Sequence, residues 1–228
     1  MRAKVVVAVI GAMLAASSLS ALSLDDLDVN FGIIYIGTTD PGASGPSIIT
    51  PLYGLSLPIQ VSGPFFIEPM LEFYTTFYQW TGTAVAPAAM ENAQGFLTLG
   101  TLVSFHGGAR WAVSPAITLG GSVGIDFLLR FPIEFLMADQ NAAADTGSGL
   151  GWFFGAARFL YPEARLFMKW QVTPAIGLVL NVRAWYPLFQ LWDGQNLPFP
   201  DQFMFAGGIG FAVRLGRPVT ANTAPAAK

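Results

Sequence analysis

Three residues of the chain have the types and spacing of a hydrolytic site. Ser104 stands two residues before His106, the only histidine, so both side chains share one face if this segment is a strand. Asp126 falls on the same face of the next predicted strand. A serine, a histidine and an acid can act as nucleophile, base and orienting group. A hydrolase is therefore one hypothesis; the other is that these side chains are hydrogen-bonded in a protein interior, since no specific motif surrounds them.

The sequence contains no other pattern with recognisable chemistry. It has no cysteine, which excludes disulfides and thiolate metal sites. It also has no phosphate-binding loop, metal-ligand cluster or dinucleotide motif, so we predict neither a metal nor a cofactor. The formal net charge is -3, whereas nucleic-acid binding requires a basic surface, so no nucleic-acid partner is expected.

The composition indicates a membrane protein. Hydrophobic residues make up 53% of the chain and charged residues only 11%, compared with about 25% charged residues in a typical soluble domain. After residue 24, however, no uninterrupted apolar run reaches the roughly 18 residues of a transmembrane helix. Because lipid tolerates only helices and closed barrels as spanning structures, the sequence predicts a β-barrel.

The first 23 residues have the order of a cleavable secretory signal peptide. Arg2 and Lys4 provide a positive start, residues 5–16 are mostly apolar, and small residues follow. The apolar stretch is shorter than the roughly 20 residues that a spanning helix needs, although a retained anchor helix is the alternative. We predict cleavage near Ala21 to Ser23.

Alternation of side chains supports strands in the rest of the chain. In residues 116–131 the odd positions are apolar apart from one glycine, and the even positions are mostly small or polar. Residues 176–188 and 203–215 follow the same rule, which is typical of transmembrane strands. The remaining predicted strands are residues 28–38, 48–61, 65–79, 95–113 and 152–171.

The segment 152–171 fits the alternation less well than the other seven. Arg158 is out of phase with the three charged residues that follow it in this segment. A β-bulge near Pro162 would restore the phase, because proline is tolerated at bulges. We therefore predict an irregular strand here.

The connections predict the topology. Three short turns share the pattern Val-Ser/Thr-(Gly)-Pro, at residues 60–64, 111–115 and 170–174. They alternate with longer connections at about 39–47, 80–94, 132–150 and 190–201. Short turns on one side and long loops on the other are typical of outer-membrane barrels. The fold class is thus all-β, a closed antiparallel eight-stranded up-and-down transmembrane barrel over residues 24–216, with a disordered Ala/Pro-rich tail at 217–228.

The long connections are expected outside the cell and both termini in the periplasm. Residues 83–93 and 139–151 have compositions that predict mobile segments without a core. Tryptophans beside the turns and loops predict an aromatic girdle at each membrane interface. The girdle residues are Trp80, Trp111, Trp152, Trp170 and Trp192.

Together, the signal peptide, the alternating strands and a last strand with Gly208, Gly210, Phe211, Val213 and Leu215 resemble the small outer-membrane barrels of the OmpA, OmpX and OmpW type. The resemblance covers roughly residues 24–216. It implies outer-membrane lipid as the environment and a last strand that engages the barrel-assembly machinery. The chain departs from the pattern because it does not end on an aromatic residue. The trio of Ser104, His106 and Asp126 resembles that of some outer-membrane lipid hydrolases.

If the even face of each strand points inward, nearly all strand charges lie in the lumen. Eight strands leave room for side chains or one small ligand, so opposite charges at one depth should pair and close the interior. Counting from the short turns places four charges low, five in the middle and Arg130 high. The low group is Glu68, Arg110, Lys169 and Arg214, and the middle group is Glu72, Asp126, Glu163, Arg165 and Arg183.

The leading functional hypothesis is a non-enzymatic barrel that is structural or passes small solutes through a narrow charge-lined lumen. One alternative is a barrel that binds an apolar ligand through a lateral opening, because Pro51, Pro58 and Pro69 interrupt pairing within residues 48–79. Another is a surface adhesin that acts through long acidic loops. These loops contain or adjoin seven acids and no Lys or Arg; the acids are Asp40, Glu91, Glu134, Asp139, Asp145, Asp193 and Asp201.

Overall fold

A computed structural model describes residues 23–24, 26–89, 95–133, 140–192 and 201–215, apart from the side chains of 140–145. Nearly all of the predicted signal peptide and of the predicted tail lies outside the described residues. Within the described part of the chain, no helix is long and apolar enough to cross a membrane.

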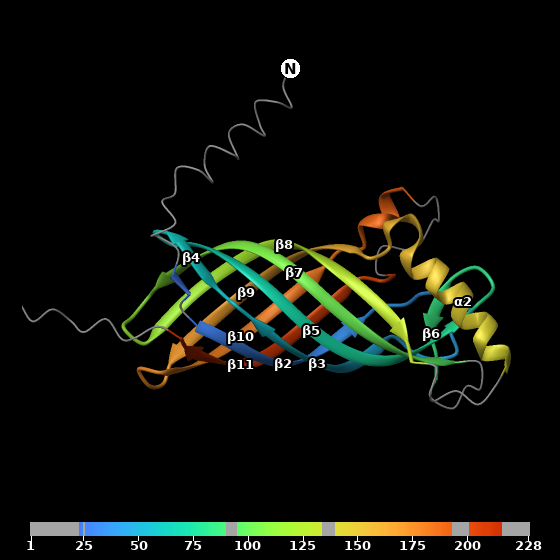
Figure 1. The fold of residues 1–228 in the computed structure, drawn as a ribbon, viewed down its shortest axis with the longest axis horizontal. Coiled ribbons are helices and arrows are strands. Elements are labelled where there is room, and N and C mark those ends of the chain that lie inside the picture. The colour runs from blue at the N-terminus through green and yellow to red at the C-terminus, as the bar shows by residue number, and fades with distance from the viewer. Residues whose placement is uncertain (1–22, 25, 90–94, 134–139, 193–200, 216–228) are drawn as a thin grey trace, which may run out of the picture.

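The strands close into one antiparallel barrel (Figure 1). The order β1-β4-β5-β3-β2-β11-β10-β9-β8-β7 returns on itself because β5 also pairs with β7. Since β3 and β4 follow each other along one wall, and β1 and β6 are short additions, the barrel has the eight strands that the turn pattern predicts. The bounds are β1 Ser23–Leu24, β2 Asp26–Ile36, β3 Ile48–Ser56, β4 Ile59–Ser62, β5 Phe65–Trp80, β6 Val85–Pro87, β7 Phe96–Ala112, β8 Ile117–Pro132, β9 Leu160–Gln171, β10 Ile176–Trp185 and β11 Met204–Arg214.

The outer surface of the barrel is an apolar belt. Large hydrophobic side chains alternate outward along every long strand, and Ile49, Val123 and Leu166 are 66–71% exposed. Their neighbours in sequence are buried in the lumen, as in the alternating burial of β3. A continuous apolar surface of this size is stable only in contact with lipid, so the strands are transmembrane.

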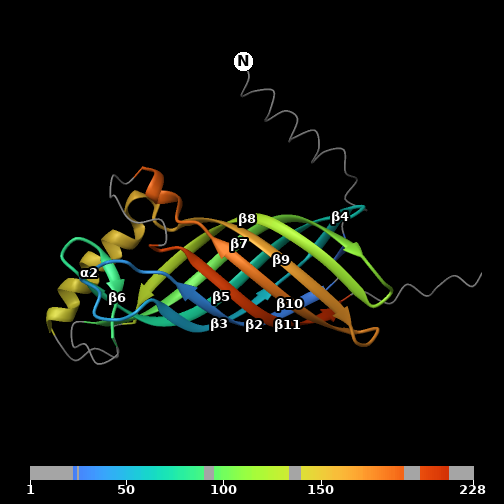
Figure 2. The same cartoon turned by 180° about the vertical axis from the view of Figure 1, so that it is seen from behind.

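The two ends of the barrel differ (Figures 1 and 2). At one end the β7–β8 and β9–β10 turns have the same geometry. The Ser114 and Thr173 side-chain hydroxyls each accept a 3.0 Å hydrogen bond from the amide three residues later. These are two of the predicted short turns. The other end carries β6, the helix α2 (Gln140–Phe154) and the short helix η4 (Leu188–Leu191).

The structure corrects the start of the predicted strand at 152–171. Residues 152–154 end α2, a 3-10 helix, η3 (Gly155–Ala157), follows, and β9 begins only at Leu160. A helix forms at residues 152–154 instead of the predicted strand because Phe153, 1% exposed, packs into the hydrophobic core at the mouth of the barrel. Arg158 therefore precedes the strand, and its phase relative to later residues has no meaning.

The predicted bulge at Pro162 is also absent. Pro162 pairs with Ile125 in an uninterrupted register, and its carbonyl accepts a bond from Tyr186 just beyond the end of β10. A proline is tolerated there because the β9–β10 ladder ends beside it. The predicted strand 176–188 likewise stops at Trp185, because Pro187 caps η4.

Two segments predicted to be mobile contain ordered structure. Residues 85–87 form β6, which pairs with Tyr78–Trp80 of β5 and buries Val85 and Ala86. Residues 140–154 form α2. Large apolar residues of these segments and of the residues that follow them, such as Val85 and Phe153, lie together in the core at the long-loop end of the barrel, which the composition of each segment alone did not reveal.

The β3–β5 ladder is short. It joins only Tyr53–Ser56 to Met70–Phe73, whereas β5 pairs with β7 over its whole length below residue 79. The amide of Leu57 donates to the carbonyl of Pro69, so the backbone amides and carbonyls of the odd residues of β3 point toward β5. Pro51 therefore lacks its amide hydrogen on this side, and above Tyr53 the hydroxyl of Thr50 bonds the Thr75 carbonyl at 2.7 Å instead.

Candidate functional site

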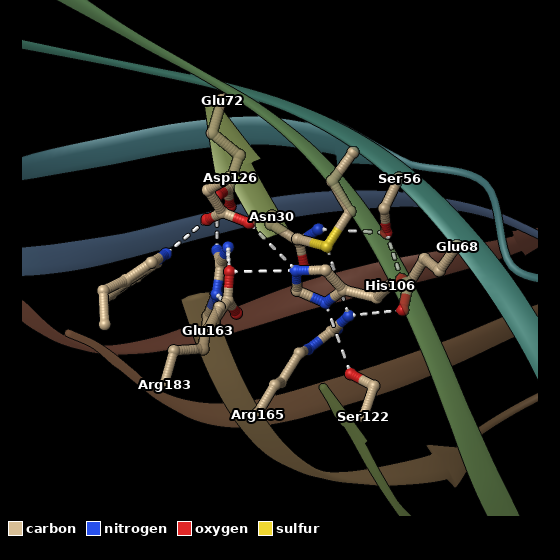
Figure 3. Close-up of polar contacts among 12 residues, drawn as sticks. Asn30, Ser56, Glu68, Glu72, His106, Ser122, Asp126, Glu163, Arg165 and Arg183 are labelled. Carbon is tan, nitrogen blue, oxygen red and sulfur yellow. Dashed lines mark hydrogen bonds and ion pairs between the residues drawn. The ribbon is translucent and has the colours of Figure 1, made fainter. Parts of the chain in front are cut away.

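The middle of the lumen is filled by a connected cluster of charged side chains (Figure 3). Arg183 on β10 donates from Nε and Nη2 to both carboxylate oxygens of Glu163 on β9, at 2.6 and 2.9 Å. Its Nη1 also donates to Glu72 on β5, across the barrel. All three side chains are at most 3% exposed. One guanidinium thus bridges opposite walls of the barrel.

His106 extends this cluster to β7 and β8. Its Nε2 lies 3.2 Å from Asp126 Oδ1 and 3.1 Å from Glu163 Oε2, and Ser122 Oγ lies 3.3 Å from its Nδ1. The Trp185 indole donates to the other oxygen of Asp126. Gly124 makes room for the ring, because a Cβ there would lie 2.0 Å from His106 Cδ2.

The predicted hydrolytic trio is brought together, but not in the order of a catalytic triad. Ser104 faces Asp126 in the β7–β8 register, and its buried hydroxyl has no hydrogen-bond partner among the described residues. The hydroxyl next to the imidazole belongs to Ser122 instead. Ser104, His106 and Asp126 are at most 3% exposed, so a substrate has no direct access to them.

Below this cluster, a second ion pair crosses the lumen. Arg165 on β9 donates to Glu68 on β5 at 2.7 Å, and Ser56 donates to the same carboxylate at 2.7 Å. Glu68 was placed low and Arg165 in the middle by counting from the turns. They meet because β5 and β9 approach each other across the interior, and because both side chains are long.

Above the cluster, Arg130 has aromatic partners. Its guanidinium lies 4.9–5.8 Å from the ring centroids of Tyr78, Phe153 and Tyr161, and it donates to the Tyr161 hydroxyl at 3.1 Å. It is fully buried, and no carboxylate in the described part of the chain forms an ion pair with it. Arg130, the one charge predicted at the high level, therefore has cation–π contacts in the described part of the chain instead of an ion pair.

The short-turn end of the lumen is open. A cavity of about 630 Å³ there is lined by charged side chains from several strands. We call it the lower vestibule; its charged lining is Asp26, Asp28, Glu68, Arg110, Arg165, Lys169 and Arg214. Lys169 forms an ion pair with Asp26, Arg110 donates to the Gln60 side chain at 3.1 Å, and Arg214 is exposed.

Several of these partners were missed in the sequence. Asp26 and Asp28 fall on the inward face of β2, two positions apart. Asp28 begins the predicted strand at 28–38, and a strand start two residues earlier would have added Asp26. Tyr74 and Tyr78 share the inward face of β5 with Glu68 and Glu72, which was a readable signal for an aromatic layer. Trp185 carried no such signal, since its partner Asp126 is 59 residues away.

Three of the five tryptophans predicted to form the aromatic girdle have exposed side chains. Trp111 and Trp170 at the short-turn end and Trp192 at the long-loop end are 49–58% exposed. Trp152 is 7% exposed and belongs to the hydrophobic core, which corrects its assignment. Trp80 is half-buried against the same core.

Only two of the acids of the long connections can be placed fully. Asp40 accepts a bond from the Gly42 amide, and Asp201 accepts bonds from the Thr39 amide at 2.7 Å and hydroxyl at 3.2 Å. Burial raises the pKa of Asp201 above its ordinary value, against the opposing effect of these bonds. Outside the described residues lie Glu91, Glu134, Asp139, Asp193 and the side chain of Asp145.

No family model and no curated protein matches the sequence. Solved structures similar to the chain include Neisserial surface protein A, with a TM-score of 0.53 at 8% identity over 85% of this chain and 98% of that one. Ail, the attachment invasion locus protein of Yersinia pestis, matches with a TM-score of 0.48 at 6% identity over 83% and 97%. The outer-membrane enzyme PagL matches with a TM-score of 0.37 at 14% identity over 82% and 98%. At these identities the likeness to Neisserial surface protein A shows a shared fold, that of a small outer-membrane barrel.

Proposed function

We propose that this protein is a non-enzymatic outer-membrane barrel whose lumen is sealed, with both termini in the periplasm and the α2 end outside the cell. The observation that carries the proposal is the bridge from Glu72 through Arg183 to Glu163, which spans the barrel with buried side chains. The apolar belt supports residence in lipid, and the short turns opposite longer connections support the orientation.

The layer around Arg130 supports a second seal. Tyr78, Phe153 and Tyr161 surround its guanidinium, and α2 packs against β5 and β8 above it. A solute that entered the lower vestibule would meet the Glu68–Arg165 pair first, then the central cluster, and then this aromatic layer. These three layers therefore favour a structural role for the barrel over passage of solutes.

Planar-bilayer conductance of the refolded barrel tests the seal. We expect no steady conductance steps from the wild type, and regular steps would contradict the proposal. A triple variant, Glu72→Ser with Glu163→Ser and Arg183→Ser, removes both signs of charge from the central layer together. Conductance in this variant would place the main seal in the central layer, and silence would place it around Arg130.

A lateral route for an apolar ligand is a second candidate. The observation in its favour is the short β3–β5 ladder, where Pro51 and Pro69 each remove a backbone donor. Above Tyr53 the ladder is replaced by a hydrogen bond from the Thr50 hydroxyl to the Thr75 carbonyl. A ladder with few backbone bonds opens at lower cost than its neighbours. The apolar ligand would be a lipid acyl chain that enters from the membrane.

The absence of cysteine makes this route testable. A Thr50→Cys, Thr76→Cys pair would supply the only thiols of the chain, at positions that face each other if the register continues. Binding of a fluorescent fatty acid to the barrel in lipid vesicles should be lost when the pair is oxidised and restored by reductant. Equal binding in both redox states would exclude this route.

Engagement of the barrel-assembly machinery by the last strand stays a prediction. Its support is that β11 pairs with β2 over Met204–Arg214 and so closes the barrel. Pull-down of the machinery by variants of Phe211 and Val213 during export would test it.

A further inference from the structure

We propose that His106, Asp126 and Glu163 form a binding site for one divalent transition-metal ion at mid-depth in the lumen of the barrel. The three residues come from β7, β8 and β9, and their ligand atoms all lie within 4.8 Å of one another. The sequence alone predicts no metal site because the three residues are spread over 58 positions. Only the register of three consecutive strands brings them together.

The geometry fits the coordination of an ion such as Zn²⁺. His106 Nε2 is 3.2 Å from Asp126 Oδ1 and 3.1 Å from Glu163 Oε2. With metal–ligand bonds of about 2.1 Å, neighbouring ligand atoms are about 3.0 Å apart in octahedral sites and about 3.4 Å apart in tetrahedral sites. One imidazole and two carboxylates are also a donor set that Zn²⁺ accepts.

Each of the three side chains is held by a further partner, as metal ligands in proteins usually are. Ser122 contacts Nδ1, the nitrogen of His106 that points away from the carboxylates. Arg183 holds Glu163 through two bonds (Figure 3). The Trp185 indole donates to Asp126. These partners fix the orientation of the donor atoms before any ion binds.

An unpartnered hydroxyl gives independent support. Ser104 Oγ is fully buried and has no hydrogen-bond partner in the described part of the chain. Its residue pairs with Asp126 across the β7–β8 ladder and precedes His106 by two positions on the same face. A buried hydroxyl without a partner costs about 1–3 kcal/mol, and a bound ion with its water would give this oxygen a partner.

The net charge of the cluster also favours a bound cation. The side chains joined by direct contacts include three carboxylates, Glu72, Asp126 and Glu163, but only one guanidinium, Arg183. With a neutral imidazole the buried cluster carries a charge of −2, and uncompensated buried charge is costly. One divalent ion would neutralise it. The competing explanation is that protons do so, which the experiment must distinguish.

The ion would join β7, β8 and β9 and stabilise the barrel, because a metal that binds only the folded state adds its binding free energy to folding. Glu163 belongs both to this site and to the bridge that closes the lumen, but the two proposals are tested separately, since conductance and metal binding are separate measurements. A barrel that conducts ions could still hold the metal, and a sealed barrel could still lack it.

The single histidine allows a direct test on the wild-type protein. The tag-free chain is labelled with ¹⁵N-histidine, refolded in detergent, stripped with chelator and titrated with Zn²⁺. Only His106 contributes ring signals. We expect the Nε2 resonance to move to the position of a metal-bound nitrogen at one Zn²⁺ per barrel, while Nδ1 stays protonated. Ring resonances that do not respond to Zn²⁺ would overturn the proposal.

Variants supply the second arm, with Co²⁺ absorbance and competition by chelator as the readout. Glu163→Gln should weaken binding by more than about 100-fold, beyond the effect of an outer partner, and Trp185→Phe by about 10–100-fold. Glu68→Gln is the matched control, a buried acid that bonds Arg165 and Ser56, and should bind as the wild type does. Equal affinity in Glu163→Gln and the wild type would mean an adventitious surface site and overturn the proposal. If Glu163→Gln fails to refold, Trp185→Phe and the histidine resonances decide it.

Discussion

The two halves of the lumen handle buried charge in different ways. In the lower vestibule, ion pairs such as Lys169–Asp26 line a cavity of about 630 Å³, and the Lys169 side chain keeps 14% of its surface exposed. In the upper half, Arg130 is fully buried among aromatic rings beneath α2. The same alternating strands thus produce a polar mouth at one end and a protein core at the other. The type of inward residue and the length of the adjoining connection decide which one forms.

The central cluster separates these halves and should show the largest effect of any single substitution. Arg183→Met leaves Glu72 and Glu163 without their shared cation. Removing one partner of a buried ion pair costs about 3–5 kcal/mol, so the free energy of unfolding should fall by that amount. Urea unfolding of the barrel in detergent, followed by tryptophan fluorescence, measures it.

Arg214→Met is the control for this variant, because Arg214 is an exposed residue at the edge of the lower vestibule. We expect its free energy of unfolding to stay within about 0.5 kcal/mol of the wild type. Equal losses in the two variants would contradict the view that depth in the lumen sets the importance of a charge.

A substitution in the upper half should have the next largest effect. Arg130→Met keeps the volume but removes the cation that contacts Tyr78, Phe153 and Tyr161. A desolvated cation–π contact is worth about 2 kcal/mol, and we expect a loss of this size in urea unfolding. Near-UV circular dichroism should also change, because the rings lose their common partner. A stable variant with an unchanged aromatic spectrum would show that the layer is held by ring packing alone.

The lower vestibule should tolerate the loss of an ion pair better. Lys169→Met removes the cation that pairs with Asp26 in a solvent-lined cavity. Because the Lys169 side chain keeps 14% of its surface exposed, this pair should contribute less than the buried pairs of the central cluster, and salt should screen it in part. We expect a small loss in the urea midpoint at low salt that shrinks at high salt. A loss as large as that of Arg183→Met would remove the distinction between the two regions.

The sequence predicted the barrel and its inward-facing residues because alternation and turn chemistry are local signals. Residues 116–131 show both faces of β8 directly, and the repeated turns at Ser114 and Thr173 gave the strand count. The identity of the lumen charges followed from the same alternation. Seven of the ten predicted residues are at most 3% exposed, and they are Glu68, Glu72, Asp126, Arg130, Glu163, Arg165 and Arg183.

The partners of these charges could not be predicted in the same way. Which side chains meet across the interior depends on strand tilt and register around the closed barrel, so Glu68 meets Arg165 and Glu72 meets Arg183 over 97 and 111 residues of sequence. The strand predicted to begin at residue 152 was wrong for another reason. Phe153 packs into the hydrophobic core at the mouth of the barrel, a tertiary contact that overrides the strand pattern beginning at Trp152.

The smallest effect concerns the outermost part of the upper half, where Asp201 joins the chain before β11 to Thr39 after β2. Because burial raises the pKa of Asp201 in the folded state, its protonated form is the one that folding favours. Its contribution to stability is therefore fully present below the ordinary aspartate pKa of about 3.9 and is lost as the pH rises through the raised folded value. Asp201→Asn removes this titration while keeping an oxygen that can accept from the Thr39 amide.

We expect the wild type to lose stability at this contact relative to Asp201→Asn as the pH rises from about 3.5 to 7. Hydrogen exchange of the Thr39 amide, corrected for the intrinsic pH dependence of exchange, measures the local opening free energy in both proteins. A difference between them that stays constant over this range would mean that the bonds from Thr39 offset the effect of burial, and a change in the opposite sense would mean that these bonds govern the pKa of Asp201. The long-loop end would then be held by ordinary surface hydrogen bonds, and the buried upper core would end below it, at the layer of Arg130 and α2.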